Sequence, residues 1–491
     1  MYALYHSEGA VYSSRKTLFR PSTLYPEYPF ACDAISPEKN IVYESVRDLF
    51  HIADLDSSHF GSAEWNPLGE YVKPGDRVLI KPNLVMDRNL GGYGEDCLFT
   101  NPSVIAAVID YVVIALRGTG RIVLADAPMQ SCDLGKLAEE SGIVDLLDFY
   151  SSAGVIIEFK DLRELKSVSE NGRLYQTVTE LDSGVVVDMG KDSSFFGLSD
   201  SHLSRLRITN YDPSELRKHH TADKHEYRIS RELLEADVVI NMPKMKTHRK
   251  AGVTGALKNL VGVNTRKEYL PHHSVGSSDE GFDEYSKRSK FKSLSAFFLD
   301  KKNMYLGSTE SHLTSIYRFL SLVLGSLGRR ISEDNYSEGS WFGNDTIWRM
   351  VLDINKVALY ADKEGVLKDQ PQRKMIVVSD MVVAGEGEGP LLPEPVEIGC
   401  VAFSDSSIEH DVAMARLAGS SPEVFPTIFH SMRDSSGMRL PYQANTVCRS
   451  NSVLFDGCAL EELNDDRFFS MKPADGWKPV FQTGFSRKEE Q

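Results

Sequence analysis

The chain has 491 residues and a formal net charge of −15, from 55 Lys and Arg against 70 Asp and Glu. This balance argues against broad nucleic-acid binding, because such binding depends on cations that neutralise phosphates. No stretch reaches the roughly 18 apolar residues that a transmembrane helix needs, so no membrane span is predicted. The first residues lack a basic segment followed by an apolar run, and we therefore expect no signal peptide and a cytoplasmic protein.

Residues 1–75 are rich in Tyr, Pro and Ser and are predicted to form an N-terminal extension over the core. One helix is expected there, from Glu38 to about Ala53.

Short apolar runs and helical segments then alternate, which predicts an α/β core whose first part covers residues 76–265. Strand, helix and strand joined by short connections are typical of a parallel sheet. The expected strands are Asp76–Lys81, Arg121–Ala125, Gly154–Glu158 and Asp237–Asn241. The expected helices are 101–117, 134–140 and 143–149.

The alternation stops after residue 265, and residues 266–370 are predicted to be a helical insertion. Its expected helices are 294–300, 315–327 and 345–361. A strand at 374–379 and a helix at 406–419 indicate the second part of the core, residues 371–435. Residues 436–491 are expected to form a strand pair, 446–448 with 452–455, and a tail. The predicted fold is therefore α/β, with a mostly parallel, doubly wound sheet.

The strongest candidate site is a basic loop, Pro243–Gly262, that follows the strand ending at Asn241. Ligands of open parallel sheets bind beyond the carboxyl ends of strands. Glycines let backbone N–H groups approach a ligand, and the clustered lysines suit a phosphate or carboxylate. His248 can exchange protons near neutral pH, and Lys258 can bind charge or form a covalent adduct. The further candidates for binding a ligand or cofactor are Lys244, Lys246, Thr247, Gly252, Thr254, Gly255 and Asn259. A solvated basic loop is the alternative.

Three polar residues lie at or beyond other strand ends. Lys81 and Asn83 are candidates to extend the anion pocket, and Asp126 is a candidate acid/base or a loop-capping residue.

A second, acidic candidate site combines Asp380 and Glu388 with Asp411 downstream. It suits a divalent cation or sugar hydroxyls, or it pairs with the basic loop. A flexible acidic turn is the alternative. His272 and His273, which precede four acidic residues, are further candidate metal ligands, and an exposed mobile loop is the alternative for them.

These segments resemble the family catalogued as domain of unknown function 362. The resemblance spans roughly residues 76–420 and rests on Val78–Val85, Thr100–Pro102, Leu124–Pro128, Asn241–His248, Thr254–Asn259 and Val377–Pro390. The family implies no settled activity. Many relatives carry a ferredoxin-like cysteine cluster, which this chain lacks.

The order His248, Gly252, Gly255, Lys258 and Gly262 is also similar to the nickel-pincer lactate racemase family. That similarity implies an acid/base role for His248 and a covalent, nucleotide-derived cofactor on Lys258. It also implies a metal ligand at His272 or His273.

Together these observations predict an enzyme that acts on an anionic small molecule or uses a phosphorylated cofactor, with proton transfer by His248. Racemisation, redox and transfer chemistry remain open, and so does a divalent metal. The alternatives are a non-catalytic ligand-binding or assembly protein and a cation-dependent hydrolase or transferase. The sequence leaves the oligomeric state open.

Overall fold

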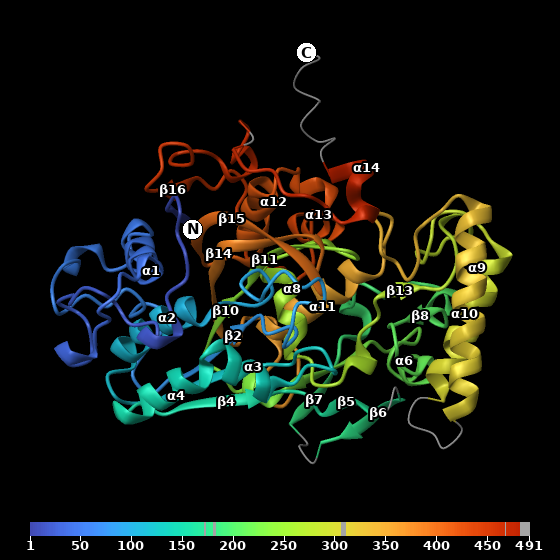
Figure 1. Ribbon diagram of the computed structural model, residues 1–491, viewed down its shortest axis with the longest axis horizontal. Coiled ribbons are helices and arrows are strands. Elements are labelled where there is room, and N and C mark those ends of the chain that lie inside the picture. Colours follow the sequence, from blue (N-terminus) through green and yellow to red (C-terminus); the bar gives the residue numbers. More distant parts are fainter. Residues whose placement is uncertain (171–172, 180–182, 306–310, 467, 482–491) are drawn as a thin grey trace.

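The computed structural model describes residues 1–170, 173–179, 183–305, 311–466 and 468–481. A large mixed sheet forms the centre of the molecule, in the strand order β16-β1-β15-β14-β10-β2-β3-β4 (Figure 1). Its strands are β1 (Tyr2–His6), β2 (Arg77–Pro82), β3 (Arg121–Asp126), β4 (Ile157–Asp161), β10 (Val238–Met242), β14 (Lys374–Glu388), β15 (Leu392–Ser404) and β16 (Cys448–Ser450), with β11 (Lys244–His248) and β12 (Gly252–Thr254) attached beside β14.

The strands β14, β10, β2, β3 and β4 are parallel to one another, and β15 returns antiparallel to β14. Three smaller sheets pair β5 (Leu165–Glu170) with β6 (Arg173–Val178), β7 (Gly184–Asp188) with β9 (Glu226–Ser230), and β8 (Leu206–Arg207) with β13 (His273–Ser274). The predicted α/β fold with a mostly parallel sheet is therefore confirmed.

Helices cover both faces of the sheet because successive strand side chains point to opposite sides. Val78 and Ile80 enter the core that α1 and α2 share, whereas Leu79 enters the core that α11 and α12 share. The helices are α1 (Ile41–Ile52), α2 (Pro102–Leu116), α3 (Leu134–Ser141), α4 (Ile143–Ser152), α5 (Asp200–Leu203), α6 (Pro213–His219), α7 (Arg231–Leu234), α8 (Ala256–Asn259), α9 (Lys290–Met304), α10 (Ser311–Ser332), α11 (Ile347–Tyr360), α12 (Ser407–Leu417), α13 (Pro426–Met432) and α14 (Lys478–Phe481). In the part of the chain that is described, no helix is long and apolar enough to cross a membrane.

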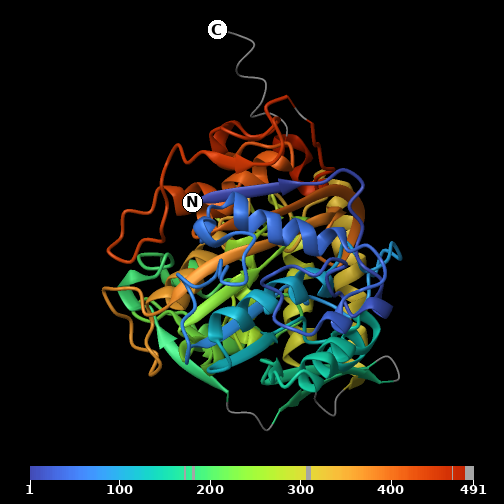
Figure 2. The same ribbon diagram turned by 90° about the vertical axis from the view of Figure 1, so that its left-hand side faces the viewer.

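The two ends of the chain differ from their predictions. The N-terminal region is more than an extension, because β1 is a sheet strand that pairs with both β15 and β16 (Figure 2). The predicted strand pair within 436–491 is wrong: β16 pairs with β1 instead, and 452–455 forms a turn. Both strands find partners far away in sequence, which a local pattern does not reveal. Residues 482–491 of the predicted tail lie outside the described residues.

Two internal predictions also change. The predicted insertion ends before α11, whose residues are almost all buried against the sheet, so only α9 and α10 project as a hairpin at one end of the molecule (Figure 1). The flexible acidic turn that was the alternative for the segment after Asp380 is not formed, because β14 continues to Glu388 and forms a long hairpin with β15. Its glycines had suggested a loop, but the strand uses them for close packing. A Cβ on Gly385 would lie 2.7 Å from Cγ of Lys246.

Candidate functional site

A cavity of about 340 Å³ opens beyond the carboxyl ends of β2, β3 and β10, where open α/β sheets bind ligands. Five of its lining residues are cations: Lys246, Arg249, Lys250, Lys258 and Lys267. The lining also has apolar residues, here called the apolar wall, which include Val85, Met129, Ile208, Tyr211, Val261, Leu270 and Leu391. The cavity therefore combines a basic floor with an apolar wall.

None of the four lysines in the lining forms an ion pair with a carboxylate among the described residues, and the pKa values of three of them are lowered to about 7 or 8. Burial and the neighbouring charge of Lys244 lower the pKa of Lys246 to about 7. Burial lowers the pKa of Lys267 to about 7, and burial with the charge of Lys250 lowers the pKa of Lys258 to about 8. A desolvated cation beside other cations favours its neutral form, and an anion placed among them would reverse this effect.

Lys258 stands at the centre of this group, on the short helix α8. Asp411 fixes the start of that helix, because its carboxylate accepts hydrogen bonds from the backbone N–H groups of Ala256 (2.6 Å) and Leu257 (3.1 Å). Gly255 precedes them at a place where a Cβ would lie 2.2 Å from the same carboxylate. No hydrogen bond or ion pair engages the Lys258 ammonium group within the described residues, so it is available to a ligand.

The hydrogen bonds of His248 fix which of its nitrogens carries the proton. The backbone N–H groups of Lys250 (3.0 Å) and Ala251 (3.1 Å) both donate to Nδ1. Burial and the charge of Lys258 lower the pKa of His248 well below its ordinary value, so the ring is neutral. In a neutral imidazole with Nδ1 accepting, Nε2 carries the hydrogen. His248 therefore offers the cavity a hydrogen-bond donor.

His272 has the opposite arrangement. Its Nδ1 lies 2.7 Å from the carbonyl oxygen of Leu270, which can only accept, so Nδ1 carries the hydrogen. Burial and the charges of Lys258 and Lys250 lower the pKa of His272 well below its ordinary value. Its Nε2 is consequently a free lone pair. The cavity thus holds two neutral imidazoles, one that donates through Nε2 and one that accepts there.

A chain of amides holds the floor of the cavity. Lys246 donates to Oδ1 of Asn83 (2.6 Å), and Asn83 donates to Oδ1 of Asn259 (3.1 Å). Asn259 in turn donates to Oδ1 of Asn241 (2.8 Å), whose amide binds the carbonyl of Ala256 (2.8 Å). The chain ties the ends of β2 and β10 to α8 and orients Lys246.

Lys81 and Asp126 form a buried ion pair (2.7 Å) beneath this floor. The other oxygen of Asp126 accepts from the backbone N–H of Leu84 (2.7 Å). Gly262 lies directly against the pair, where a Cβ would come within 2.2 Å of Asp126. Asp126 lines the cavity, but Lys81 does not. Lys81 is thus placed to hold Asp126 and the adjoining loops.

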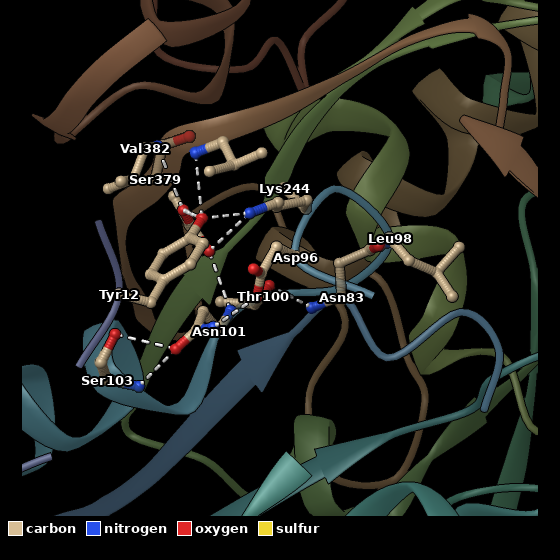
Figure 3. A network of polar contacts seen from close by, with 12 residues as sticks. Tyr12, Asn83, Asp96, Leu98, Thr100, Asn101, Ser103, Lys244, Ser379 and Val382 are labelled. Carbon is tan, nitrogen blue, oxygen red and sulfur yellow. Dashed lines mark hydrogen bonds and ion pairs between the residues drawn. The ribbon is translucent and has the colours of Figure 1, made fainter. Parts of the chain in front are cut away.

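Lys244 and Asp380 form a second buried ion pair (3.0 Å), away from the cavity lining. Tyr12 donates to Asp380 (2.6 Å) and also contacts the Lys244 ammonium group, and the backbone N–H of Asn101 donates to the same carboxylate (2.8 Å). Tyr12, Asn101 and Lys244 converge in this network in Figure 3. Lys244 therefore does not line the cavity, and both oxygens of Asp380 are already engaged by donors of the protein.

Of the residues that were predicted to bind a metal, His272 and Glu388 line the cavity and the other three do not. Asp411 caps α8, Asp380 is enclosed by its network, and His273 is buried outside the cavity lining. Glu388 does line the cavity but is paired with Arg249 (3.1 Å) and with the backbone of Asp475. Among the described residues, no three His, Cys, Asp or Glu side chains gather as a set of metal ligands.

The remaining predicted residues divide between lining and support. Thr254 lines the cavity, whereas Thr247 is buried and donates to the carbonyl of Gly387 (2.9 Å). Gly252 has a φ of +79°, and a Cβ there would lie 2.4 Å from the ring of Phe425. Both residues shape the loop rather than contact the cavity.

Comparison with known proteins shows the family to which the chain is similar. A model of the domain of unknown function DUF362 matches residues 78–199 and 200–416. The chain belongs to this family. A thylakoid-associated protein of Synechocystis sp. is 31% identical over 218 residues, which are 44% of this chain and 48% of that protein. The chain thus aligns with about half the length of this curated relative. The predicted family is confirmed, and the similarity of the loop to lactate racemases stays a prediction.

Several lining residues of this DUF362 protein were not among the predicted site residues. Lys267 joins the basic floor from a 3₁₀ turn, and its ammonium group donates to the carbonyl of Ala127 (2.9 Å). Lys250 lies within the basic loop, but no pattern separates it from a solvent-exposed lysine. Met129, Ile208 and Tyr211 come from segments that the topology folds over the sheet edge. For these residues the sequence carries no local signal.

Proposed function

We propose that this protein is an enzyme that binds an anionic small molecule in the cavity and acts on it by proton transfer. The observation that carries the proposal is the group of Lys246, which is buried, and Lys258 and Lys267, which are half-buried: all three have lowered pKa values and no carboxylate ion pair among the described residues. Desolvated cations of this kind are costly, and they are common where a protein holds an anion.

The apolar wall narrows the class of ligand. A free inorganic anion would use only the basic floor and leave Ile208, Tyr211 and Leu270 facing an empty space. A molecule with a phosphate or carboxylate at one end and an apolar or aromatic body matches both surfaces. The same features suit a phosphorylated cofactor. We expect no role for nucleic acid.

The two histidines and Lys258 supply the proposed chemistry. The Nε2–H of His248 would stabilise negative charge that develops on the substrate, because it donates without a net charge. The lone pair on Nε2 of His272 would accept a proton, while Lys258 would hold the anion in its charged ammonium form. Proton transfer by His248 was the expectation from sequence. The two backbone donors at Nδ1 of His248 lead us to give that role to His272.

The proposal also includes the compartment of the cell in which the enzyme acts. We place the enzyme in the cytoplasm; the similar protein of Synechocystis sp. is named a thylakoid-associated protein, so fractionation of cells into soluble and membrane material would test this placement.

Binding is tested first with sulfate and pyrophosphate by calorimetry, comparing the wild type with Lys258→Met. A charge-assisted hydrogen bond contributes about 1.5–3 kcal/mol, so affinity should fall roughly tenfold or more. Lys368→Met is the matched control, because Lys368 is an exposed lysine paired with Asp362 outside the cavity. Equal affinities for all three proteins would refute the proposed anion site.

Catalysis is tested with extracts of anionic metabolites, incubated with the wild type or with His272→Ala and analysed by mass spectrometry. Depletion of an anionic compound by the wild type alone would support an enzyme. Retention of a compound without depletion would instead establish a ligand-binding protein. Intact-mass analysis of the chain from its native host would reveal whether Lys258 carries a covalent group.

A further inference from the structure

The hairpin of α9 and α10 presents an unusual outer surface. Nine of its large apolar side chains are strongly exposed, and Phe319, Leu322 and Ile331 are 65%, 62% and 59% accessible to solvent. The other six are Leu294, Phe297, Met304, Ile316, Val323 and Leu327. We call these nine side chains the hairpin surface. Soluble monomers rarely expose an apolar patch of this extent without a partner.

The inner side of α10 explains why its large residues face outwards. Three small residues of α10, Ser321, Gly325 and Gly328, pack against α9. The Ser295 hydroxyl donates to the carbonyl of Ser321 (2.7 Å), and a Cβ on Gly328 would lie 2.8 Å from Cγ of Lys292. Small residues bring the two helices close together, and the bulky residues are left on the opposite side of α10.

The hairpin is joined to the rest of the protein and is also held together internally, so its surface is not a frayed segment. Arg207 pairs with Asp300 of α9 (3.0 Å), and Lys292 pairs with Asp334 (3.0 Å). Tyr317 of α10 stacks on Phe298 and Tyr305. The hairpin lies at the end of the molecule opposite α1 (Figure 1).

Positive charge accompanies the apolar face. Residues 287–332 contain nine Lys or Arg and two Asp or Glu, in a chain whose net charge is −15. Within the described residues, Lys301, Arg318 and Arg330 form no ion pair. Lys301 lies over the ring of Phe297, 5.7 Å from its centroid. Unpaired cations therefore stand within and beside the apolar residues.

We propose that the hairpin surface docks onto an anionic lipid bilayer, with α9 and α10 lying in the plane of the membrane. Interfacial helices combine Phe and Leu on one face with Lys and Arg beside it, as this hairpin does. Anionic lipid attracts such cations, with each contributing to binding close to the surface. A second copy of the chain is the poorer occupant, because it would bring two sets of unpaired cations together. This proposal does not depend on the proposed catalytic function.

The test is flotation of the full chain with vesicles of phosphatidylcholine alone or with one third phosphatidylglycerol. The wild type should bind the anionic vesicles more tightly, and high salt should weaken binding because it screens the charges. Phe319→Gln combined with Leu322→Gln should weaken it by at least about tenfold. Arg318→Gln and Arg330→Gln should each weaken it about fivefold.

The matched control is Val453→Gln, because Val453 is 94% exposed and lies outside the hairpin. All substituted side chains are exposed, and thermal unfolding would verify that each variant is folded. The proposal is overturned if the wild type binds neither vesicle or if the hairpin variants float like the control. It is also overturned if light scattering finds a dimer that Phe319→Gln with Leu322→Gln converts to a monomer, without any vesicle binding. That result would make the surface a self-association interface.

Discussion

Lys244 and Lys246 lie two residues apart on β11, and both side chains are almost completely buried, yet they are in opposite electrostatic situations. Lys244 has a carboxylate partner in Asp380 and a phenol in Tyr12. Lys246 has only neutral acceptors, Asn83 and the carbonyl of Leu98, and it lines the cavity. Residues two apart on a strand point to the same face, so their position alone does not distinguish them. The groups that contact each lysine decide whether it stabilises the fold or is available to a ligand. Here the paired lysine stabilises the fold, and the lysine without a carboxylate partner lines the cavity.

Removing the charge of Asp380, the partner of Lys244, should have the largest effect on the free energy of unfolding. Asp380→Asn removes the charge partner of Lys244 and leaves a buried cation uncompensated, which typically costs about 3–5 kcal/mol. Urea unfolding should report a loss of this size in the free energy of unfolding. A loss below about 1 kcal/mol would contradict the assignment of this pair to the fold.

Substitution of Lys246, which has no carboxylate partner, should weaken ligand binding more than it destabilises the fold. Lys246→Met should weaken sulfate binding roughly tenfold, because a charge-assisted hydrogen bond to the anion is lost. The same variant should lose less unfolding free energy than Asp380→Asn, since no partner charge is left behind. Calorimetry and urea unfolding of both variants would check the contrast. A larger stability loss in Lys246→Met would reverse it.

The affinity for sulfate should also depend on pH, because the lysines of the cavity have lowered pKa values. Lys246 and Lys267 have pKa values of about 7 and Lys258 of about 8, so all three are protonated at low pH and neutral at high pH. Sulfate keeps its charge over this range, and its affinity should therefore fall as the pH rises from about 6 to about 9. Binding of the anion favours the charged lysines, so proton uptake should accompany it near neutral pH. Calorimetry in buffers of different ionisation enthalpy measures that uptake, and a pH-independent affinity would argue against these lysines as the anion's ligands.

The smallest effect concerns Glu338, a carboxylate at the cavity whose charge acts on Lys250. Glu338→Gln removes a negative charge near the anion, and affinity for sulfate should rise by up to about fivefold. The side chain keeps its shape, so Thr209, which lies 3.4 Å away, retains an acceptor. A decrease in affinity would indicate that Glu338 instead holds a ligand directly.

Much of the fold could be predicted because its signals are local. The buried runs of β2, β3 and β10 and the Asn101 cap of α2 are visible in the sequence, and they place the basic loop beyond β10. The pairing of β1 with β15 and β16 could not be predicted, since its partners are about 400 residues away. The same holds for the buried position of α11, which looks like any amphipathic helix.

For the candidate site, sequence patterns located the loop but not the orientation of its side chains. They placed His248 and Lys258 together, yet grouped Lys244 with Lys246 and grouped Asp380 with Asp411 as metal ligands. The separation depends on contacts with Tyr12 and with the backbone of α8, which come from other parts of the chain. The opposite proton positions on His248 and His272 also depend on backbone groups that only the folded chain brings near.

Those backbone groups have an evolutionary consequence. The proton on His248 is positioned by two main-chain N–H groups, at residues 250 and 251, and not by any side chain. Substitutions elsewhere around the cavity leave that donor in place as long as the loop keeps its path. Related proteins can therefore change Ile208, Tyr211 or Leu270 to accept differently shaped molecules while inheriting the same hydrogen-bond donor, so the backbone preserves the chemistry while the wall diversifies.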